Sequence, residues 1–524
     1  MNGNYVVNDA GRRIPKYIDG FGYTIPYRNR HREIEVLREK TEKNFKYVKT
    51  ENKILPSIRE AIQKCDLKDG MIISFHHHLR DGDYIINMVL EEIARLGIKD
   101  LTIAASSLQK VHEPMIEHIK NGVITGIRTS GMRGALAKEI SYNNILKKPV
   151  IFQTHGGRAR SIEMGEMKID VAFIAASSCD KMGNMSGRTG KSAFGSMGYA
   201  MTDAKYADKV VAITDNLVEY PLRNQSIDQT LVDYVVVVDE IGDIDKIATG
   251  ATRVTQNPKE LLMAQYAARV INASGYMKDG FSFQAGSGGA SLAVIRFLKE
   301  YMKEKGIKGG TISGGITSVL VEMLEEGYFE ALLDAQTFDA GAVDSFNRNI
   351  NHIEMSASMY ANPYSKGCVA NMLDIMVLSA TEVDINFNVN VLTGSDGVIM
   401  GAQGGHPDTA EGAKLRIVTA PITRKNIPII RDKVTTVVTP GCNVDIVVTD
   451  KGIAINPRRP DLSEKLRNKD LPIKDIYELK YEAERMVGKP SEPVFGEEIV
   501  GIVEARDGSV MDVVRRVIGS NFSR

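Results

Sequence analysis

The sequence predicts an α/β protein made of two similar halves, each an open, mostly parallel sheet flanked by helices. Three observations favour this class: a repeated opening motif, short apolar runs alternating with amphipathic stretches, and a length of 524 residues. A chain this long exceeds the size at which one hydrophobic core keeps growing. We expect an N-terminal extension over 1–52, a first domain over 53–250 (the first half), and a second domain with a C-terminal tail over 251–524 (the second half).

The opening motif occurs twice. Lys68-Asp69-Gly70 precedes an apolar run, a polar loop and a helical pattern that ends at Gly97-Ile98-Lys99. Lys278-Asp279-Gly280 opens the same series 210 positions later, and this copy ends at Gly306-Ile307-Lys308. Such self-similarity indicates a duplicated structural unit. A duplicated α/β unit leaves the cleft between its copies as the natural place for a binding site.

Composition excludes several classes of function. Basic and acidic residues number 66 each, and a net charge of zero does not favour nucleic acid as a bulk partner. The four cysteines lack the paired spacing of a disulfide framework or a zinc site. No stretch approaches the ~18 consecutive apolar residues of a membrane span, and Met1–Pro15 has no apolar signal region. We therefore expect a cytoplasmic protein without a membrane segment.

The first half alternates predicted strands with predicted helices. A helix is predicted over 84–96 because Ile85, Val89 and Ile93 recur on one stripe. The apolar runs do not alternate with polar residues, which is typical of strands in a parallel sheet covered on both faces. These predicted strands are 71–75, 101–105, 150–153, 171–175, 210–214 and 234–238.

The second half repeats this scheme. Predicted strands at 281–284 and 311–313 flank a predicted helix at 290–303. Leu373–Leu378 echoes Ile169–Ile174, so the duplication extends well beyond the opening motif.

The two ends of the chain are less definite. After about residue 463 a charged helical stretch leads into 498–504, Asp507-Gly508 and 509–517, which could form a hairpin or a strand followed by a helix. We expect the N-terminal extension to pack on the first domain. Its basic cluster could bind a phosphate or carboxylate, or simply form a solvated surface. The cluster comprises Arg28, Arg30, His31 and Arg32.

Three glycine loops in the second half carry most of the functional signal: Ala285–Gly289, Ser313–Gly315 and Met400–His406. Glycine lets backbone N–H groups approach a ligand, and a following helix adds its positive N-terminal end. Such a loop stabilises an anion, which could be a phosphate, a carboxylate, or the oxyanion formed when a thioester or anhydride carbonyl is attacked. Alternatively, the glycines only make tight turns between strands and helices.

Better-known phosphate motifs do not fit these loops. Gly286-Ser287-Gly288 lacks the third glycine and the acidic partner of a dinucleotide fingerprint. Gly190-Lys191-Ser192 has Met185 where a P-loop requires glycine. We therefore do not expect nucleotide hydrolysis.

His76, His77 and His78 follow the first predicted strand, at the place equivalent to the glycine loop of the second half. Successive side chains of an extended chain alternate sides, which disfavours a shared metal, and we expect no metal site. His77 and Arg80 could bind a carboxylate, because an arginine fork matches one bidentately. Ordinary polar loop residues are the alternative.

Longer segments resemble a known family. Thr381–Asn390, the Gly401–Asp408 loop and Val447–Ala454 occur in the order shown by the CoA-transferase superfamily. The chain resembles the alpha chains of citrate lyase over nearly its whole length. The resemblance includes His76–Arg80 and Phe283–Ser291. The resemblance implies two CoA-transferase-like domains. It also implies transfer of a carrier thiol from acetate to citrate, giving the citryl carrier and free acetate.

The same resemblance implies substrates and partners. Citrate and an acetyl thioester carrier are the expected substrates, and the lyase (beta) and acyl carrier (gamma) subunits are the expected partners in an oligomeric complex. We expect no covalently bound cofactor, because the acyl carrier subunit supplies a CoA-like, phosphopantetheine-type prosthetic group. The resemblance makes Gly404 and Gly405 the oxyanion donors and places Gly286, Ser287, Gly288, Gly289, Gly314 and Gly315 along the carrier and substrate slot, with His77 and Arg80 as candidates for binding citrate.

One departure from the superfamily bears on mechanism. Many CoA-transferases place a nucleophilic glutamate at the end of the strand that follows the glycine-loop helix, where this chain has Thr311–Gly315. Glu354 lies too far along the chain to replace it, and we expect Glu322 to lie on a helix surface. Direct attack by a citrate carboxylate on the acetyl thioester, giving a mixed anhydride, is then the simplest chemistry.

Two other functions stay open. A stand-alone acyl-CoA:carboxylate CoA-transferase or hydrolase would need a carboxylate nucleophile or an activated water. A non-catalytic subunit would only dock an acyl carrier.

Overall fold

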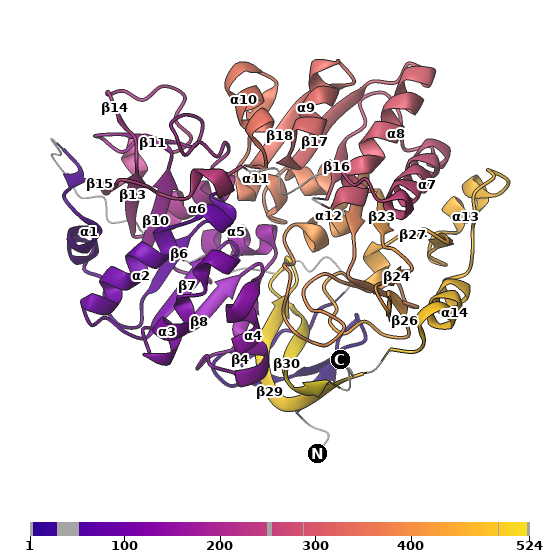
Figure 1. Ribbon diagram of the computed structural model, residues 1–524, viewed down its shortest axis with the longest axis horizontal. Coiled ribbons are helices and arrows are strands. Elements are labelled where there is room, and N and C mark those ends of the chain that lie inside the picture. Colours follow the sequence, from indigo (N-terminus) through magenta and orange to yellow (C-terminus); the bar gives the residue numbers. More distant parts are fainter. Residues whose placement is uncertain (1–3, 29–51, 249–253, 287, 491, 521–524) are drawn as a thin grey trace.

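Two large sheets flanked by helices, one for each half of the chain, dominate the computed structural model (Figure 1). The structure describes residues 4–28, 52–248, 254–286, 288–490 and 492–520. Among these residues, no helix combines the length and apolar character needed to cross a bilayer.

The first sheet has ten strands in the order β30-β29-β9-β8-β7-β6-β10-β13-β15-β5. All neighbours are parallel except the antiparallel pair β29–β30. The strands are β5 (Ile54–Leu55), β6 (Ile72–Phe75), β7 (Leu101–Ala105), β8 (Ile124–Thr129), β9 (Val150–Phe152), β10 (Val171–Ala176), β13 (Lys209–Thr214), β15 (Tyr234–Val237), β29 (Pro493–Glu504) and β30 (Val510–Ser520).

The second sheet has eight strands in the order β19-β18-β17-β16-β20-β23-β27-β28, with only β27–β28 antiparallel. From β9 to β15 and from β19 to β27 the two orders match strand for strand. This match confirms the predicted α/β class with internal duplication. The strands are β16 (Phe283–Ala285), β17 (Gly309–Ile316), β18 (Phe329–Thr337), β19 (His352–Glu354), β20 (Ile375–Ser379), β23 (Leu415–Thr419), β27 (Ile446–Thr449) and β28 (Gly452–Ile455).

Small three-stranded sheets repeat the duplication at finer scale. Asp180 accepts hydrogen bonds from the backbone N–H and the side-chain amide of Asn184. Asp384 makes the same two bonds with Asn388. Both aspartates therefore build the same tight turn. The sheets contain β11 (Ser178–Asp180), β12 (Met185–Ser186) and β14 (Leu217–Val218), and β21 (Glu382–Asp384), β22 (Val389–Asn390) and β26 (Ile430–Arg431).

Capping residues set where helices begin and end. At the start of α7, Asn257 accepts a hydrogen bond from the Lys259 N–H ahead of Pro258, and the helix ends at Gly275 with φ +81°. The helices are α1 (Ile58–Lys64), α2 (Ile85–Arg95), α3 (Met115–Lys120), α4 (Gly134–Asn143), α5 (His155–Glu163), α6 (Gly198–Tyr206), α7 (Pro258–Ser274), α8 (Gly289–Lys305), α9 (Ser318–Glu325), α10 (Ala340–Arg348), α11 (Ala357–Ala361), α12 (His406–Gly412), α13 (Pro460–Leu466) and α14 (Ile476–Val487).

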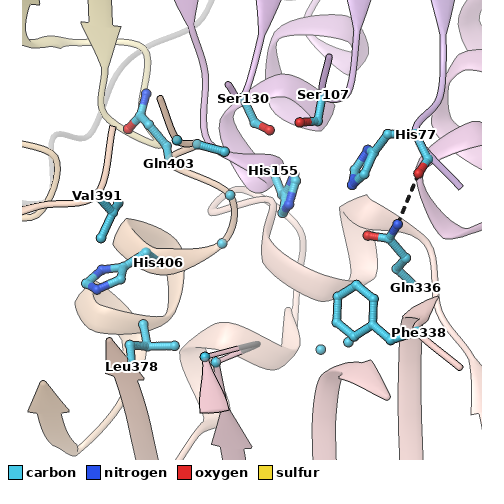
Figure 2. A pocket seen from close by; sticks show the side chains of 18 of the residues that line it. His77, Ser107, Ser130, His155, Gln336, Phe338, Leu378, Val391, Gln403 and His406 are labelled. Carbon is cyan, nitrogen blue, oxygen red and sulfur yellow. Dashed lines mark hydrogen bonds between the residues drawn. The ribbon is translucent and has the colours of Figure 1, made fainter. Parts of the chain in front are cut away.

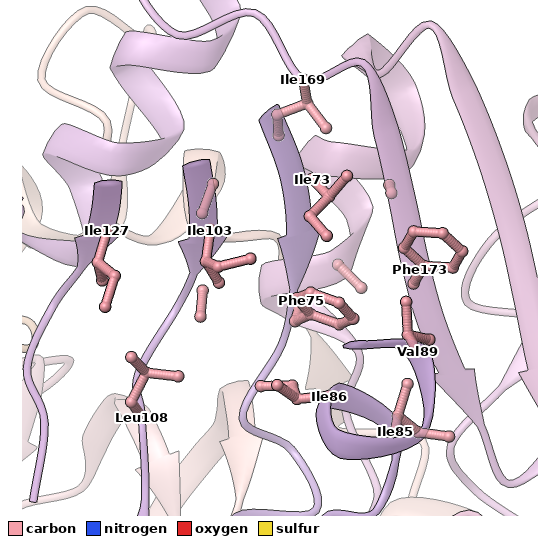
Figure 3. Close-up of a cluster of buried hydrophobic side chains, with 14 of the residues drawn as sticks. Ile73, Phe75, Ile85, Ile86, Val89, Ile103, Leu108, Ile127, Ile169 and Phe173 are labelled. Atoms are coloured by element: carbon pink, nitrogen blue, oxygen red, sulfur yellow. The ribbon is translucent and has the colours of Figure 1, made fainter. Parts of the chain in front are cut away.

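The core of the first half lies between the sheet and α2 (Figure 3). The apolar stripe predicted for this helix is buried, with Ile85 and Val89 facing the sheet. Phe75 of β6 and Phe173 of β10 stack with ring centroids 5.8 Å apart. Removal of these side chains from water supplies the main driving force that holds helix and sheet together.

The C-terminal tail forms a hairpin, not a strand followed by a helix. Strand β29 pairs in parallel with β9, placing Ile502 beside Ile151, so the tail returns to the sheet of the first half. Figure 1 shows this yellow hairpin beside the purple first half. The division of the chain at residue 250 stays a prediction.

The N-terminal residues pack on this hairpin. The side-chain amide of Asn8 donates to the Met511 carbonyl at 2.6 Å, and Arg12 pairs with Asp512 at 2.6 Å. Of the basic cluster, Arg28 forms an exposed ion pair with Asp9 at 2.8 Å. The other members, Arg30, His31 and Arg32, lie outside the described residues.

Candidate active site

A cavity of about 370 Å³ lies between the two halves, and both contribute to its walls (Figure 2). Loops that follow the carboxyl ends of parallel strands form much of it, which is where open α/β sheets bind ligands. Gln336, at the end of β18, donates from its side-chain amide to the His77 carbonyl at 3.2 Å and so joins the halves across this cavity.

Most of the predicted site residues line this cavity. Gly289, at the start of α8, does not, and Ser287 lies outside the described residues. The N–H of Gly286 donates to the Val377 carbonyl at 2.8 Å and is therefore occupied. What each residue does stays a prediction. The predicted residues that line the cavity are His77, Arg80, Gly286, Gly288, Gly314, Gly315, Gly404 and Gly405.

Two arginines make the cavity attractive to anions. Arg80 lies over the Phe338 ring, with its Cζ 4.6 Å from the centroid, and its Nη1 is buried without an acceptor in the described part of the chain. Arg133 donates to the Gln109 side chain at 3.3 Å. The described residues lining the cavity include no aspartate, glutamate or cysteine. A buried guanidinium nitrogen without an acceptor is costly, so the cavity suits a carboxylate ligand.

Three histidines that line the cavity remain neutral at physiological pH. Burial lowers the pKa of His155 to about 3 and that of His406 to about 4. Burial also holds the pKa of His77 well below its usual range. His155 Nδ1 and His406 Nε2 have no partner within the described residues. These rings are therefore suited to hydrogen-bonding a ligand as neutral imidazoles.

Lowering the pH from 7 to 5 should destabilise the fold through His155. The ring stays neutral when folded but gains a proton below pH ~6.5 when unfolded. The unfolded state then binds more protons, so the free energy of unfolding falls by up to about 1.4 kcal/mol per pH unit. Urea unfolding midpoints at pH 7 and pH 5 measure this change. His155→Gln should reduce it, and an identical pH dependence would contradict a neutral His155.

The glycine loop before α12 is held by the first half. The Gln403 N–H donates to the Ser130 carbonyl at 2.8 Å, and the Gly404 carbonyl accepts from the His155 N–H at 3.0 Å. Gly404 has φ +56°, and a Cβ at Gly405 would overlap the Tyr360 hydroxyl. Within the described chain, the N–H groups of Gly404 and Gly405 have no acceptor. They are available to a ligand oxygen.

The Asp408 side chain stabilises the contact between this loop and the first half. It accepts from the Thr154 hydroxyl at 2.6 Å and the Gly156 N–H at 3.0 Å, so a residue of α12 caps the start of α5. Burial raises the pKa of Asp408 to about 6. Arg506, in the turn of the C-terminal hairpin, has its Nε 3.8 Å from the Asp408 carboxylate.

Several lining residues had no signal in the sequence. Arg133 and His155 stand singly directly before and at the start of helices, where no periodicity marks them. Contact between His155 and the Gly404 loop joins segments about 250 positions apart, which a local pattern cannot reveal.

The two glutamates that the sequence excludes as nucleophiles, Glu354 and Glu322, do not line the cavity. Glu354 lies at the end of β19 and accepts from the Met197 N–H at 2.6 Å, and burial raises its pKa. Glu322 is exposed on α9. Among the described residues, no group of three or more histidine, cysteine, aspartate or glutamate side chains could hold a metal ion.

Comparisons with known proteins agree with one another. Residues 51–517 match the family "Citrate lyase, alpha subunit (CitF)". The citrate lyase alpha chain of Haemophilus influenzae is 53% identical over 467 residues, which cover 89% of this chain and 93% of that protein.

Solved structures extend the comparison. A crystal structure from Streptococcus mutans, described as the alpha subunit of citrate lyase in complex with citrate, is 57% identical with a TM-score of 0.89, covering 90% of this chain and 93% of that chain. A 4-hydroxybutyrate CoA-transferase from Porphyromonas gingivalis, 19% identical with a TM-score of 0.53 over 83% of this chain and 98% of its own, shares the fold. This chain belongs to the citrate lyase alpha subunit family, a transferase family with the CoA-transferase fold.

Proposed function

We propose that this chain transfers a carrier thiol from acetate to citrate, converting acetyl carrier and citrate into citryl carrier and acetate. The observation that carries the proposal is the interdomain cavity, which holds two arginines and, among its described residues, no carboxylate. Citrate carries three carboxylates, and Arg80 and Arg133 supply planar forks that match them. The Streptococcus mutans relative in complex with citrate supports the same ligand.

Transfer proceeds by direct attack. A citrate carboxylate oxygen attacks the acetyl carbonyl, the carbon–sulfur bond breaks, and the carrier leaves as a thiolate beside a mixed acetyl–citryl anhydride. This thiolate attacks the citryl carbonyl and acetate departs. No general base is needed, because carboxylates with pKa values near 4 are ionised at pH 7. The chain aligns the reactants and stabilises both oxyanions, for which the N–H groups of Gly404 and Gly405 are the donors.

The lack of a carboxylate or a thiol among the described lining residues supports this route over a covalent enzyme intermediate. Ser313, Gly314 and Gly315 stand where a nucleophilic glutamate would be expected, and the described lining residues include neither a carboxylate nor a thiol. A hydrolase would need a base to activate water, and His155 is a very weak base, because desolvation lowers its pKa to about 3.

We also propose that this chain works in the cytoplasm, in an oligomeric complex with a lyase subunit and an acyl carrier subunit. The carrier subunit brings the phosphopantetheine-type prosthetic group, and this chain holds no cofactor covalently. The family description as one subunit of citrate lyase supports this division of labour.

Incubation of the chain with acetyl carrier and isotopically labelled citrate tests the reaction. We expect mass spectrometry to show labelled citryl carrier and no mass added to the chain, even after trapping with hydroxylamine. An adduct on a carboxylate would establish the covalent route and overturn direct attack. Intact acetyl carrier that remains bound would indicate a docking subunit without catalysis.

A further inference from the structure

Arg506 is buried in the turn of the C-terminal hairpin. Among the described residues, Arg160 and Arg506 are the largest side chains that are fully buried. The turn joins β29 to β30, so the backbone of Arg506 belongs to the first sheet. A buried guanidinium is costly unless its N–H groups find acceptors. The positions of those acceptors therefore show which parts of the molecule the side chain holds together.

The guanidinium of Arg506 reaches three segments of the chain between β19 and β23. Its Nη1 donates to the Asn371 side chain at 2.7 Å and to the Asp408 carbonyl at 3.3 Å. Its Nη2 donates to the Ala361 carbonyl at 2.9 Å. Ala361 is the last residue of α11, and Asp408 lies in the first turn of α12. One side chain therefore ties both helices to the first sheet.

Both helices border the candidate oxyanion site. Tyr360, the neighbour of Ala361, lines the cavity between the halves, and a Cβ at Gly405 would overlap its hydroxyl. Asp408 follows Gly405 by three positions. Arg506 does not line this cavity. It therefore holds the two segments that meet at the oxyanion site without a place in the site itself.

Glycines of α5 let these parts approach one another closely. A Cβ at Gly156 would overlap the Ala361 carbonyl, and one at Gly157 would lie 3.3 Å from the Cα of Arg506. The same helix begins at His155, which lines the cavity. The hairpin turn, α5, α11 and α12 thus meet around one guanidinium. Because packed interiors transmit strain, loss of this guanidinium would shift the cavity wall.

We infer that Arg506 is a positioning residue for the transfer reaction: its guanidinium holds α11 and α12 so that the N–H groups of Gly404 and Gly405 point at the reacting carbonyl. This inference rests on the proposed function. Within the described chain, the hydrogen bonds of Arg506 reach neither of the loops that carry Arg80 and Arg133. Its loss should therefore affect kcat and leave the KM for citrate nearly unchanged.

Arg506→Ala and Arg506→Lys test this role. We expect each to lower kcat for citryl carrier formation about 100-fold, the loss typical of a small misplacement at a reacting centre, with a KM for citrate within about twofold of the native value. Lysine keeps the charge but lacks the planar fork that reaches both helices. Millimolar guanidinium chloride should restore part of kcat to Arg506→Ala, and sodium chloride should not.

Arg160→Ala is the matched control, because Arg160 is buried beneath the same turn, where a Cβ at Gly508 would overlap its Nη2. Its Nη2 donates to Glu166 at 2.7 Å, and within the described residues it makes no hydrogen bond to α11 or α12. This variant should lose stability but keep the native kcat. A kcat as low as that of Arg506→Ala would indicate general damage and overturn the inference, as would a native kcat in Arg506→Ala.

Hydrogen exchange separates this inference from the proposed function. In Arg506→Ala we expect the backbone N–H groups of α11 and α12 to exchange faster than in the native chain, and those of α7 to exchange at the native rate. If the native chain transfers no thiol, the proposed function fails, and faster exchange would still support Arg506 as the residue that holds these helices. Unchanged exchange in α11 and α12 would exclude that role.

Discussion

Gly405→Ala should lower kcat for citryl carrier formation by about 100- to 1,000-fold. Loss of one oxyanion donor typically costs ~2.7–4 kcal/mol in the transition state. A Cβ at this position would overlap the buried Tyr360 hydroxyl, so the loop must shift and carry its N–H away from the reacting carbonyl. Initial rates at saturating citrate, followed by mass spectrometry of the carrier, measure the effect.

A control variant and a second-site rescue variant distinguish loss of the oxyanion donor from loss of folding. Gly519 on β30 has open space around it and an ordinary φ, so Gly519→Ala should retain full activity. Adding Tyr360→Phe to Gly405→Ala removes the overlapping hydroxyl and should restore part of the rate, although Gln284 loses its 2.7 Å hydrogen bond to that hydroxyl. Full activity of Gly405→Ala alone would contradict the assignment of this loop as the oxyanion site.

Arg80→Gln should raise the KM for citrate by about 100-fold, equivalent to about 2.7 kcal/mol. This magnitude is that expected for loss of a bidentate, charge-assisted hydrogen-bonded pair in a site partly shielded from water. Arg80→Lys should recover little, because an ammonium group keeps the charge but lacks the planar fork. Citrate titrations at a fixed concentration of acetyl carrier measure both variants.

Arg188 offers a matched control for Arg80. Its guanidinium also lies over a phenylalanine ring, with Cζ 3.7 Å from the Phe346 centroid, but it does not line the cavity between the halves. Arg188→Gln should change stability without changing the KM for citrate. If Arg80→Gln instead raised the KM for the carrier and left that for citrate unchanged, Arg80 would belong to the carrier site.

Much of the fold could be predicted from local patterns. The predicted strand 101–105 coincides with β7, and the predicted helix 84–96 differs from α2 by one residue at each end. Short apolar runs and a periodic stripe depend on neighbouring residues alone, which explains this accuracy. The repeated Lys-Asp-Gly motif also indicated correctly that the chain is internally duplicated, as the matching strand orders from β9 to β15 and from β19 to β27 show.

The candidate site could be predicted only in part. Glycine loops and the His77–Arg80 segment were visible because unusual residue types follow predicted strands. Arg133 and His155 were missed, because each is placed by contacts between segments far apart in the chain. The return of the tail to the first sheet was missed for the same reason: β29 pairs with β9 through register and burial that no local pattern encodes.

That returning hairpin has a consequence for biosynthesis. The side chain of Gln153, directly after β9, donates to the Glu504 carboxylate at 2.9 Å across 351 positions of chain, and the Gln403 side chain donates to the Glu504 carbonyl at 3.2 Å. A nascent chain emerges N-terminus first, so the half made earliest must wait with an uncovered sheet edge until nearly all the rest has been synthesised. Pairings this distant fold slowly. The loop that contains Gly404 therefore gains its contact with Glu504 only after about 100 further residues have been synthesised, and we expect a translation product that ends before Glu504 to lack this support.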